Sequence, residues 1–291
     1  MKLQEIILKE GGAALKAAHV GRIEKSDIPT TINYVSKLSG IPEKDLHILG
    51  SAGKSATSGD LDFGIDVNQF SPDKINSIMT DRLGKDNASY NKGFRIGSYA
   101  VPIAGDEGKG RVQVDFMFVD NPEWAKFSYF SAGTKSKYKG AIRTLLLMGI
   151  AAALNEEGTD HFEYDPDGSI VIRAGRTLDL NKGLRRIFQY RPKKASGEYM
   201  KSMKTISVDE FKKMFPDVNV SGGEVFITDP KKVLTILFGP GVKTKDVQTA
   251  EQVIKLIKQK FSKAKQEEIF LHVKQRAKSL GSKLVLPKEL Q

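Results

Sequence analysis

Apolar and polar residues alternate strictly between residues 60 and 67. Leu61, Phe63, Ile65 and Val67 are apolar, and an aspartate or a glycine stands between each pair. Successive side chains of a strand point to opposite faces, so this period of two predicts a strand with one buried face. Further strand-like runs cover residues 46–49, 94–103 and 112–119.

Helical spacing marks the segments around these strands. Apolar residues three and four apart predict helices over residues 2–18 and 28–39, the second capped by Ser26 or Asp27 and ended by Gly40. Ser71-Pro72-Asp73 opens another helix, which Gly84 closes. Residues 138–157 predict a long, largely buried helix with Gly158 as its stop.

The sequence pattern changes after Gly158, where hairpin signals begin. Residues 162–164 and 170–172 flank a turn at residues 165–168, which predicts a hairpin. A helix at 208–214, a strand at 224–228, a Gly-Pro-Gly break at 239–241 and helices near 247–261 and 264–280 complete the chain. We therefore expect an α+β protein with two domains, residues 1–157 and residues 158–291.

Composition excludes several classes of protein. The 291 residues are 40% hydrophobic, which suffices for two domains, and contain no cysteine, which excludes disulfides, thiolate zinc sites and cysteine nucleophiles. The longest apolar stretch, residues 144–154, is about half of the ~20 residues that cross a bilayer, and residues 1–5 lack a signal-peptide pattern. We expect a cytoplasmic protein without a membrane partner.

Positive charge is concentrated in the second half. Residues 1–157 carry 20 Lys and Arg against 19 Asp and Glu, whereas residues 158–291 carry 26 against 16. A basic face of this kind usually binds a polyanion such as RNA or DNA, because neutralised phosphates release counterions. A solubilising surface is the alternative interpretation.

Three aspartates in the predicted strands are candidate metal ligands. Asp60 and Asp62 share one face of their strand, roughly 6.6 Å apart along the backbone. Asp115 stands in the apolar strand 112–119, where an ionised carboxylate needs a cation. If the two strands are neighbours, three carboxylates converge on one site, and hard oxygen ligands suit Mg²⁺.

The arrangement resembles the DNA polymerase beta-like nucleotidyltransferase superfamily. The match consists of Leu49-Gly50-Ser51, eight spacer residues, Asp60-Leu61-Asp62-Phe63, and a third aspartate, Asp115, in a later apolar strand. It covers roughly residues 28–157. The resemblance implies a nucleotidyltransferase domain, with a mixed sheet and flanking helices, followed here by a second, basic α+β domain.

The resemblance also implies two-metal nucleotidyl transfer. Asp60, Asp62 and Asp115 would hold two Mg²⁺ ions, or Mn²⁺, and Asp115 would accept a proton. The substrate would be an NTP, with ATP favoured, and the Gly50-Ser51 turn would bind its β and γ phosphates.

Other polar residues are candidates for nucleotide binding. Lys54, Ser55, Thr57 and Ser58 lie in the spacer, which is otherwise a flexible polar loop. In the superfamily, the helical segment after the catalytic sheet supplies a cation for the γ-phosphate and a ring or hydroxyl for the nucleoside. The candidates here are Lys135, Lys137, Tyr138 and Lys139, and a solvated helix cap is the alternative.

Two other phosphate or metal motifs are excluded. Asp66 is on the face of Asp62 but about 13 Å further along the strand, so we expect it to be structural; a calcium loop also fails, because Ser71 stands where its glutamate belongs. Gly53-Lys54-Ser55 resembles the end of a P-loop, but Ile48 occupies the position of the first glycine.

A basic cluster in the second half is a candidate nucleic-acid site. Phe188 and Tyr190 are interleaved with its cations, a combination suited to unpaired bases, although buried aromatics under a basic surface give the same pattern. The cations are Lys182, Arg185, Arg186, Arg191, Lys193 and Lys194.

The function predicted from these features is transfer of NMP from an NTP to the hydroxyl of a polynucleotide, with pyrophosphate released. RNA is favoured over DNA, at its 3′ end. Three alternatives remain: nucleotidylylation of a small molecule or protein, synthesis of an oligonucleotide second messenger, and a non-catalytic nucleotide- or nucleic-acid-binding module.

Overall fold

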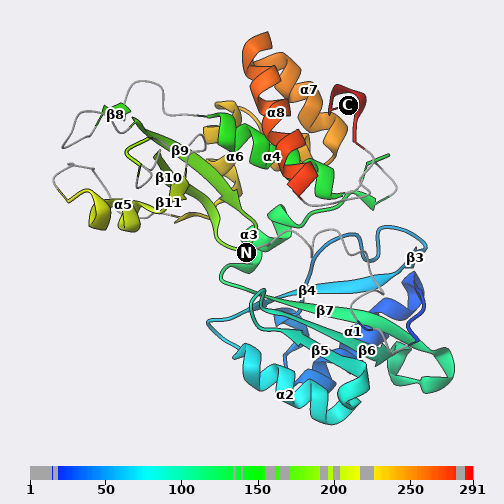
Figure 1. Cartoon of the computed structure of the whole chain (residues 1–291). Helices are drawn as coiled ribbons and strands as arrows, with labels where there is room; N and C mark the ends of the chain where they lie inside the picture. Colours follow the sequence, from blue (N-terminus) through cyan, green and yellow to red (C-terminus); the bar gives the residue numbers. More distant parts are fainter. Residues whose placement is uncertain are drawn as a thin grey trace.

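A computed structural model of the chain describes residues 15, 19–133, 136–138, 140–154, 161–163, 171–190, 196–198, 204–216, 226–279 and 286–290. Over these residues the protein is α+β, with two five-stranded sheets and eight α-helices. Figure 1 shows the first sheet with α1 and α2 in one half of the molecule, and the second sheet with the C-terminal helices in the other.

The first sheet is mixed and has the strand order β2-β4-β7-β6-β5. Its central pair, β4 and β7, is parallel, and the other neighbours are antiparallel. A separate two-stranded ladder pairs β1 with β3. The bounds are Ile23–Glu24 for β1, His47–Ile48 for β2, Thr57–Ser58 for β3, Asp60–Asp66 for β4, Ala88–Asn91 for β5, Ile96–Pro102 for β6 and Arg111–Val119 for β7.

Helices α1 (Ile28–Ser39) and α2 (Pro72–Leu83) cover the apolar face of this sheet. Phe63 and Phe116 are fully buried there, against Val35 of α1 and Met79 of α2. The period-two pattern produces this face, because it places every second side chain of β4 and β7 in the core. The opposite face of the same strands carries Asp60, Asp62 and Asp115.

The second half joins a sheet to a layer of helices. Strand order is β11-β10-β9-β8, and β12 also pairs with β10. The strands are β8 His161–Glu163, β9 Val171–Asp179, β10 Gly183–Tyr190, β11 Lys204–Ile206 and β12 Phe226–Ile227. The helices are α3 Pro122–Ser128, α4 Gly140–Ala153, α5 Val208–Met214, α6 Pro230–Phe238, α7 Ala250–Lys260 and α8 Lys263–Ser279.

Helices α3 and α4 belong to the core of this second half. Trp124 of α3 and Leu146 of α4 are fully buried in one cluster with Leu184 of β10 and Ile257 of α7. The sequence places α4 in the first domain, yet its apolar side chains pack here. The predicted boundary between residues 157 and 158 lies outside the described residues.

Most predicted elements are present. Ser71 caps α2 as predicted, and Gly40 and Gly84 end the two helices; Asp27 stands at the N-cap position of α1, but its side chain makes no capping hydrogen bond. Helix α4 spans 140–153 instead of 138–157, and β9 extends to Asp179. Missing from the sequence prediction are helices α3 and α6 and strands β1, β3, β5, β10 and β11. The predicted helix 2–18 lies almost entirely outside the described residues, as does the turn at 165–168.

Among the residues that the structure describes, no helix combines the length and the apolar character that crossing a bilayer requires.

Candidate metal centre and cavity

The three predicted metal ligands come together on the open face of the first sheet. In the parallel β4–β7 ladder Asp60 is paired with Gln113, and Asp62 is paired directly with Asp115. One carboxylate oxygen from each of Asp60, Asp62 and Asp115 lies within 4.8 Å of the others. The sequence predicted this convergence only if the two strands were neighbours. They are neighbours, so the three carboxylates form a site that could hold a metal ion.

Burial makes these carboxylates unfavourable as bare anions. Burial, followed by repulsion from Asp60 and Asp115, raises the pKa of Asp62 well above its usual range. Burial also raises the pKa of Asp115 to about 6, although hydrogen bonds from Ser98 and Gln113 act in the opposite direction. A cation among the three would remove this repulsion, and an all-oxygen donor set suits Mg²⁺.

Gln113 holds the Asp115 carboxylate from the same strand. Its amide Nε2 donates to both oxygens of Asp115, at 3.0 and 2.8 Å. The Gln113 side chain is itself 2% exposed, so the amide is fixed by its surroundings. The orientation of Asp115 is therefore set by a buried neighbour two residues away.

The Gly50 turn lies against the same carboxylates. The Leu49 N–H donates to the Asp62 carbonyl at 2.8 Å, and Gly50 follows with φ 62°, in the left-handed region. A Cβ on Gly50 would stand 2.6 Å from Asp62 Oδ2, closer than atoms can approach. Glycine is thus required here to make room for the Asp62 carboxylate.

A cavity of about 1070 Å³ opens over the three aspartates, between the two halves of the chain. Most of the described nucleotide-binding candidates line it. These are Gly50, Ser51, Ser55, Thr57, Ser58, Lys137 and Tyr138. The Lys137 ammonium lies 5.0 Å from the centre of the Tyr138 ring. Lys135 and Lys139 lie outside the described residues.

Lys54 is placed differently from the other spacer residues. Its ammonium donates to the carbonyls of Gly50, at 2.8 Å, and Ser131, at 2.6 Å, and lies 3.9 Å from the centre of the Phe130 ring. It is absent from the lining of the cavity. In this arrangement the lysine ties the Gly50 turn to the segment after α3.

The basic cluster of the second half is divided. Lys182 lines the cavity, whereas the guanidinium groups of Arg185 and Arg186 lie over the rings of Phe226 and Phe188, at 5.9 and 5.2 Å. Phe188 is fully buried and stacks on Phe211, so the expectation that its ring is available to a base is wrong. Arg191, Lys193 and Lys194 lie outside the described residues.

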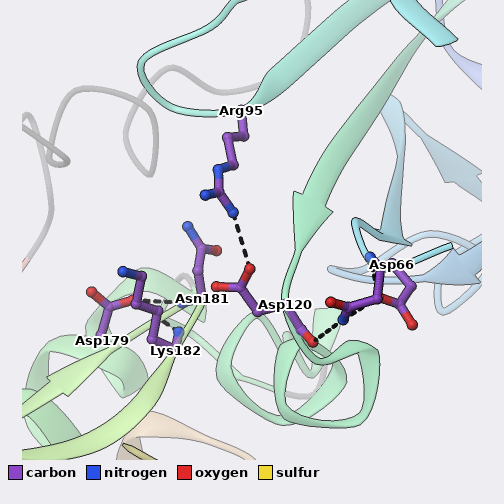
Figure 2. A network of polar contacts seen from close by, with 7 residues as sticks. Asp66, Arg95, Asp120, Asp179, Asn181 and Lys182 are labelled. Carbon is purple, nitrogen blue, oxygen red and sulfur yellow. Dashed lines mark hydrogen bonds and ion pairs between the residues drawn. The ribbon is translucent and has the colours of Figure 1, made fainter. Parts of the chain in front are cut away.

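Asp66 has the structural role expected of it. Its carboxylate accepts hydrogen bonds from the backbone and side-chain nitrogens of Asn68, at 2.9 and 2.8 Å, at the end of β4 (Figure 2). It stabilises a turn and is not among the grouped metal ligands.

Several cavity residues escaped the sequence prediction. Arg22 donates from Nε to Thr57 Oγ1, at 2.8 Å, and from a terminal nitrogen to the Thr57 carbonyl, at 3.2 Å. These bonds set its guanidinium beside Gly59, the residue that precedes Asp60 in the chain. Arg22 precedes a two-residue strand and has no local pattern that marks it. Gln113 could have been suspected, because a polar residue at i−2 shares the face of Asp115.

Comparisons of the chain with protein-family models, with curated proteins and with solved structures find no match.

Proposed function

We propose that this protein is a metal-dependent nucleotidyltransferase with a polymerase-beta-like catalytic fold. The observation that carries the proposal is the convergence of Asp60, Asp62 and Asp115 on one face of adjacent parallel strands, with ligand oxygens within 4.8 Å of one another. The Gly50-Ser51 turn beside them supports it.

The aspartates have distinct roles in the proposed reaction. Asp60 and Asp62 would hold an ion on the triphosphate side, and all three carboxylates would hold an ion on the acceptor side. When bound, Mg²⁺ polarises the α-phosphate and favours ionisation of the acceptor hydroxyl. Gln113 keeps Asp115 turned toward the site.

The transfer is an in-line displacement. The acceptor oxygen forms a bond to the α-phosphorus, and the bond from that phosphorus to the bridging oxygen breaks, so pyrophosphate leaves with the electron pair. The proton of the acceptor hydroxyl passes to Asp115. Asp115 is assigned this proton because it is paired with Asp62 across the ladder and supplies one of the three grouped oxygens.

The triphosphate side of the cavity is assigned to the groups around the start of β4. Ser51 and Ser58 supply hydroxyls, Gly50 and Gly59 allow close approach of the backbone, and Arg22 supplies a permanent positive charge. Lys137 and Tyr138 line another wall and are assigned to the nucleotide.

A polynucleotide, with RNA favoured, is the proposed acceptor. It is supported by the excess of 26 basic over 16 acidic residues in 158–291 and by the presence of Lys182 in the cavity. The burial of Phe188 removes one of the two aromatic rings that first suggested unpaired bases.

Incubation with each α-labelled NTP, Mg²⁺ or Mn²⁺, and a panel of RNA, DNA, protein and small-molecule acceptors tests the proposal. Label on an RNA 3′ end is expected, and Asp60→Asn with Asp62→Asn should abolish it. Asp86→Asn, which removes an exposed carboxylate that is not part of the cavity lining, is the matched control. Label on protein or in a free product would show that the acceptor is not a polynucleotide. Full activity in the double variant would refute the metal site.

A further inference from the structure

The cavity extends well beyond the metal ligands and the triphosphate side. The groups assigned to the triphosphate, Ser58, Gly59 and Arg22, gather at the start of β4. In an in-line displacement the attacking and leaving oxygens lie on opposite sides of the phosphorus. If the proposed function holds, the acceptor must therefore enter from the other end of the cavity.

That other end is formed by the β5–β6 hairpin and the β9–β10 turn. Arg95 immediately precedes β6, in which Ile96 is paired with Met117, two residues or about 7 Å beyond Asp115 along β7. Asn181 and Lys182 of the turn line the same cavity, although they come from the second half of the chain. Figure 2 shows Arg95, Asn181 and Lys182 together with Asp120, the residue that follows β7.

Helix α3 fixes the β9–β10 turn in this position. Trp124 Nε1 donates to the Asp179 carbonyl at 3.0 Å, and Ser128 Oγ donates to the Leu180 carbonyl at 2.7 Å. The Tyr129 hydroxyl donates to Asn181 Oδ1 at 2.8 Å. Because α3 follows β7 after a two-residue connection, the strand that carries Asp115 and the turn are held in one rigid arrangement.

The acidic groups at this end are already engaged. Asp120 forms an ion pair of 3.0 Å with Arg95, and Asp179 Oδ1 accepts hydrogen bonds from the backbone N–H groups of Asn181 and Lys182 (Figure 2). Lys182 is exposed, and no carboxylate of the described residues lies within ion-pair distance of it. Its ammonium lies 5.6 Å from the centre of the Phe226 ring, which leaves its charge available to a phosphate.

The backbone at Arg95 is also unusual. Its φ of 54° is in the left-handed region, which residues other than glycine seldom adopt. Strain of this kind persists where the surrounding structure holds it, and it is concentrated at functional sites. Here the Arg95 carbonyl accepts the Phe118 N–H at 3.0 Å, while the side chain reaches Asp120.

We propose that the β9–β10 turn and Arg95 form the acceptor subsite, in which Lys182 binds the phosphate next to the attacking hydroxyl of a polynucleotide. The inference rests on the proposed function and adds to it the direction from which the acceptor approaches. It also gives Lys182 a role in the reaction cavity that Arg185 and Arg186, the other described cations of the basic cluster, do not share.

Site-specific photocrosslinking tests the subsite directly. A photoreactive amino acid replaces Lys182 in one variant, Arg22 in a second and the exposed Lys232 of α6 in a third. Each is irradiated with Mg²⁺ and either a 5′-labelled single-stranded RNA 12-mer or labelled α,β-methylene-ATP. Position 182 is expected to capture the RNA, position 22 the nucleotide and position 232 neither.

The two proposals fail in different ways. Capture of nucleotide but not RNA at position 182, in a protein that extends this RNA, overturns the subsite alone. Absence of RNA extension by the unmodified protein overturns the polynucleotide acceptor and the subsite with it, whereas nucleotide capture at position 22 still supports the nucleotide site. Absence of nucleotide capture at position 22 together with absence of transfer to any acceptor overturns the proposed function.

Kinetics supply a second readout. Lys182→Ala is expected to raise the KM for the RNA acceptor about tenfold and to leave the KM for the NTP within about twofold, since a phosphate contact contributes to acceptor binding only. Arg95→Gly, which removes the side chain but tolerates the positive φ, should act in the same direction. Lys232→Ala is the control, and an equal rise in both KM values for Lys182→Ala contradicts the assignment.

Discussion

Asp62 and Asp115 are direct partners across the parallel β4–β7 ladder, so their carboxylates leave the same face of the sheet side by side. Asp60, two residues before Asp62, adds a third carboxylate to that face. The arrangement concentrates negative charge where solvent screens it poorly, and a bound cation is the simplest way to offset it.

Asp115→Asn is expected to stabilise the metal-free protein while it abolishes transfer. Removing one partly buried anion relieves the cost that raises its pKa to about 6. At pH 8 the free energy of unfolding in EDTA should rise by about 1–3 kcal/mol, whereas the transfer rate should fall on the order of 10³-fold. Denaturant unfolding and a transfer assay measure the two effects. A variant that is both inactive and less stable would indicate a structural role instead.

The stability of the metal-free protein should depend on pH in a defined direction. The pKa values of Asp62 and Asp115 are raised in the folded state, so that state binds protons more tightly than the unfolded chain. The contribution of these groups is fully present below about pH 4, the unfolded pKa. It is lost as pH rises through about 6, the folded pKa of Asp115.

Magnesium should reverse this loss. Because the cation takes the place of the protons, the rise in Tm caused by Mg²⁺ over EDTA is expected to be larger at pH 8 than at pH 5. Thermal unfolding at both pH values measures it. An equal rise at both would place the Mg²⁺ somewhere other than the three aspartates.

Gly50→Ala should damage the site more than an equivalent change elsewhere. The new Cβ would meet Asp62 Oδ2 at 2.6 Å, so both the turn and the carboxylate must shift. Gly40→Ala is a matched control, since Gly40 also has a positive φ of 75° but has nothing within 4 Å of an added Cβ. Both should lose about 1 kcal/mol of stability from backbone strain. Only Gly50→Ala is expected to weaken Mg²⁺ binding, measured by calorimetry.

Gln113→Leu tests whether the site needs Asp115 to be held in its orientation, and not merely to be present. The leucine removes both hydrogen bonds to the carboxylate, at 3.0 and 2.8 Å, while filling similar space. Partners that orient metal ligands typically change affinity or activity about 10–100-fold. We expect Mg²⁺ affinity to fall about 10–100-fold. Circular dichroism should show that the variant remains folded. Unchanged Mg²⁺ affinity would show that Asp115 is positioned by other groups.

Arg22→Ala is expected to raise the KM for the NTP about tenfold, since a charged hydrogen bond to a phosphate contributes roughly 1.5–3 kcal/mol. Arg22→Lys should recover part of the loss, because it keeps the charge but not the fork of donors that holds Thr57. Lys109→Ala, which breaks a surface ion pair with Asp27, is the control. Steady-state kinetics at fixed acceptor distinguish these outcomes.

Local pattern alone was enough to identify the elements that carry the site. The alternation at 60–67 and 112–119 predicts β4 and β7, and Gly40, Ser71 and Gly84 mark helix ends, because strand period and capping depend on residues close in sequence. Asp60, Asp62 and Asp115 follow as candidate ligands, and Asp66 falls outside them by its distance along the strand.

Tertiary packing decided the surroundings of these ligands. It pairs β4 with β7, turns Lys54 onto two carbonyls, buries Phe188, and brings Arg22 and the β9–β10 turn to one cavity. Each of these depends on contacts between residues far apart in the chain. No short-range period encodes such contacts, whereas the period of a strand is a property of the backbone itself.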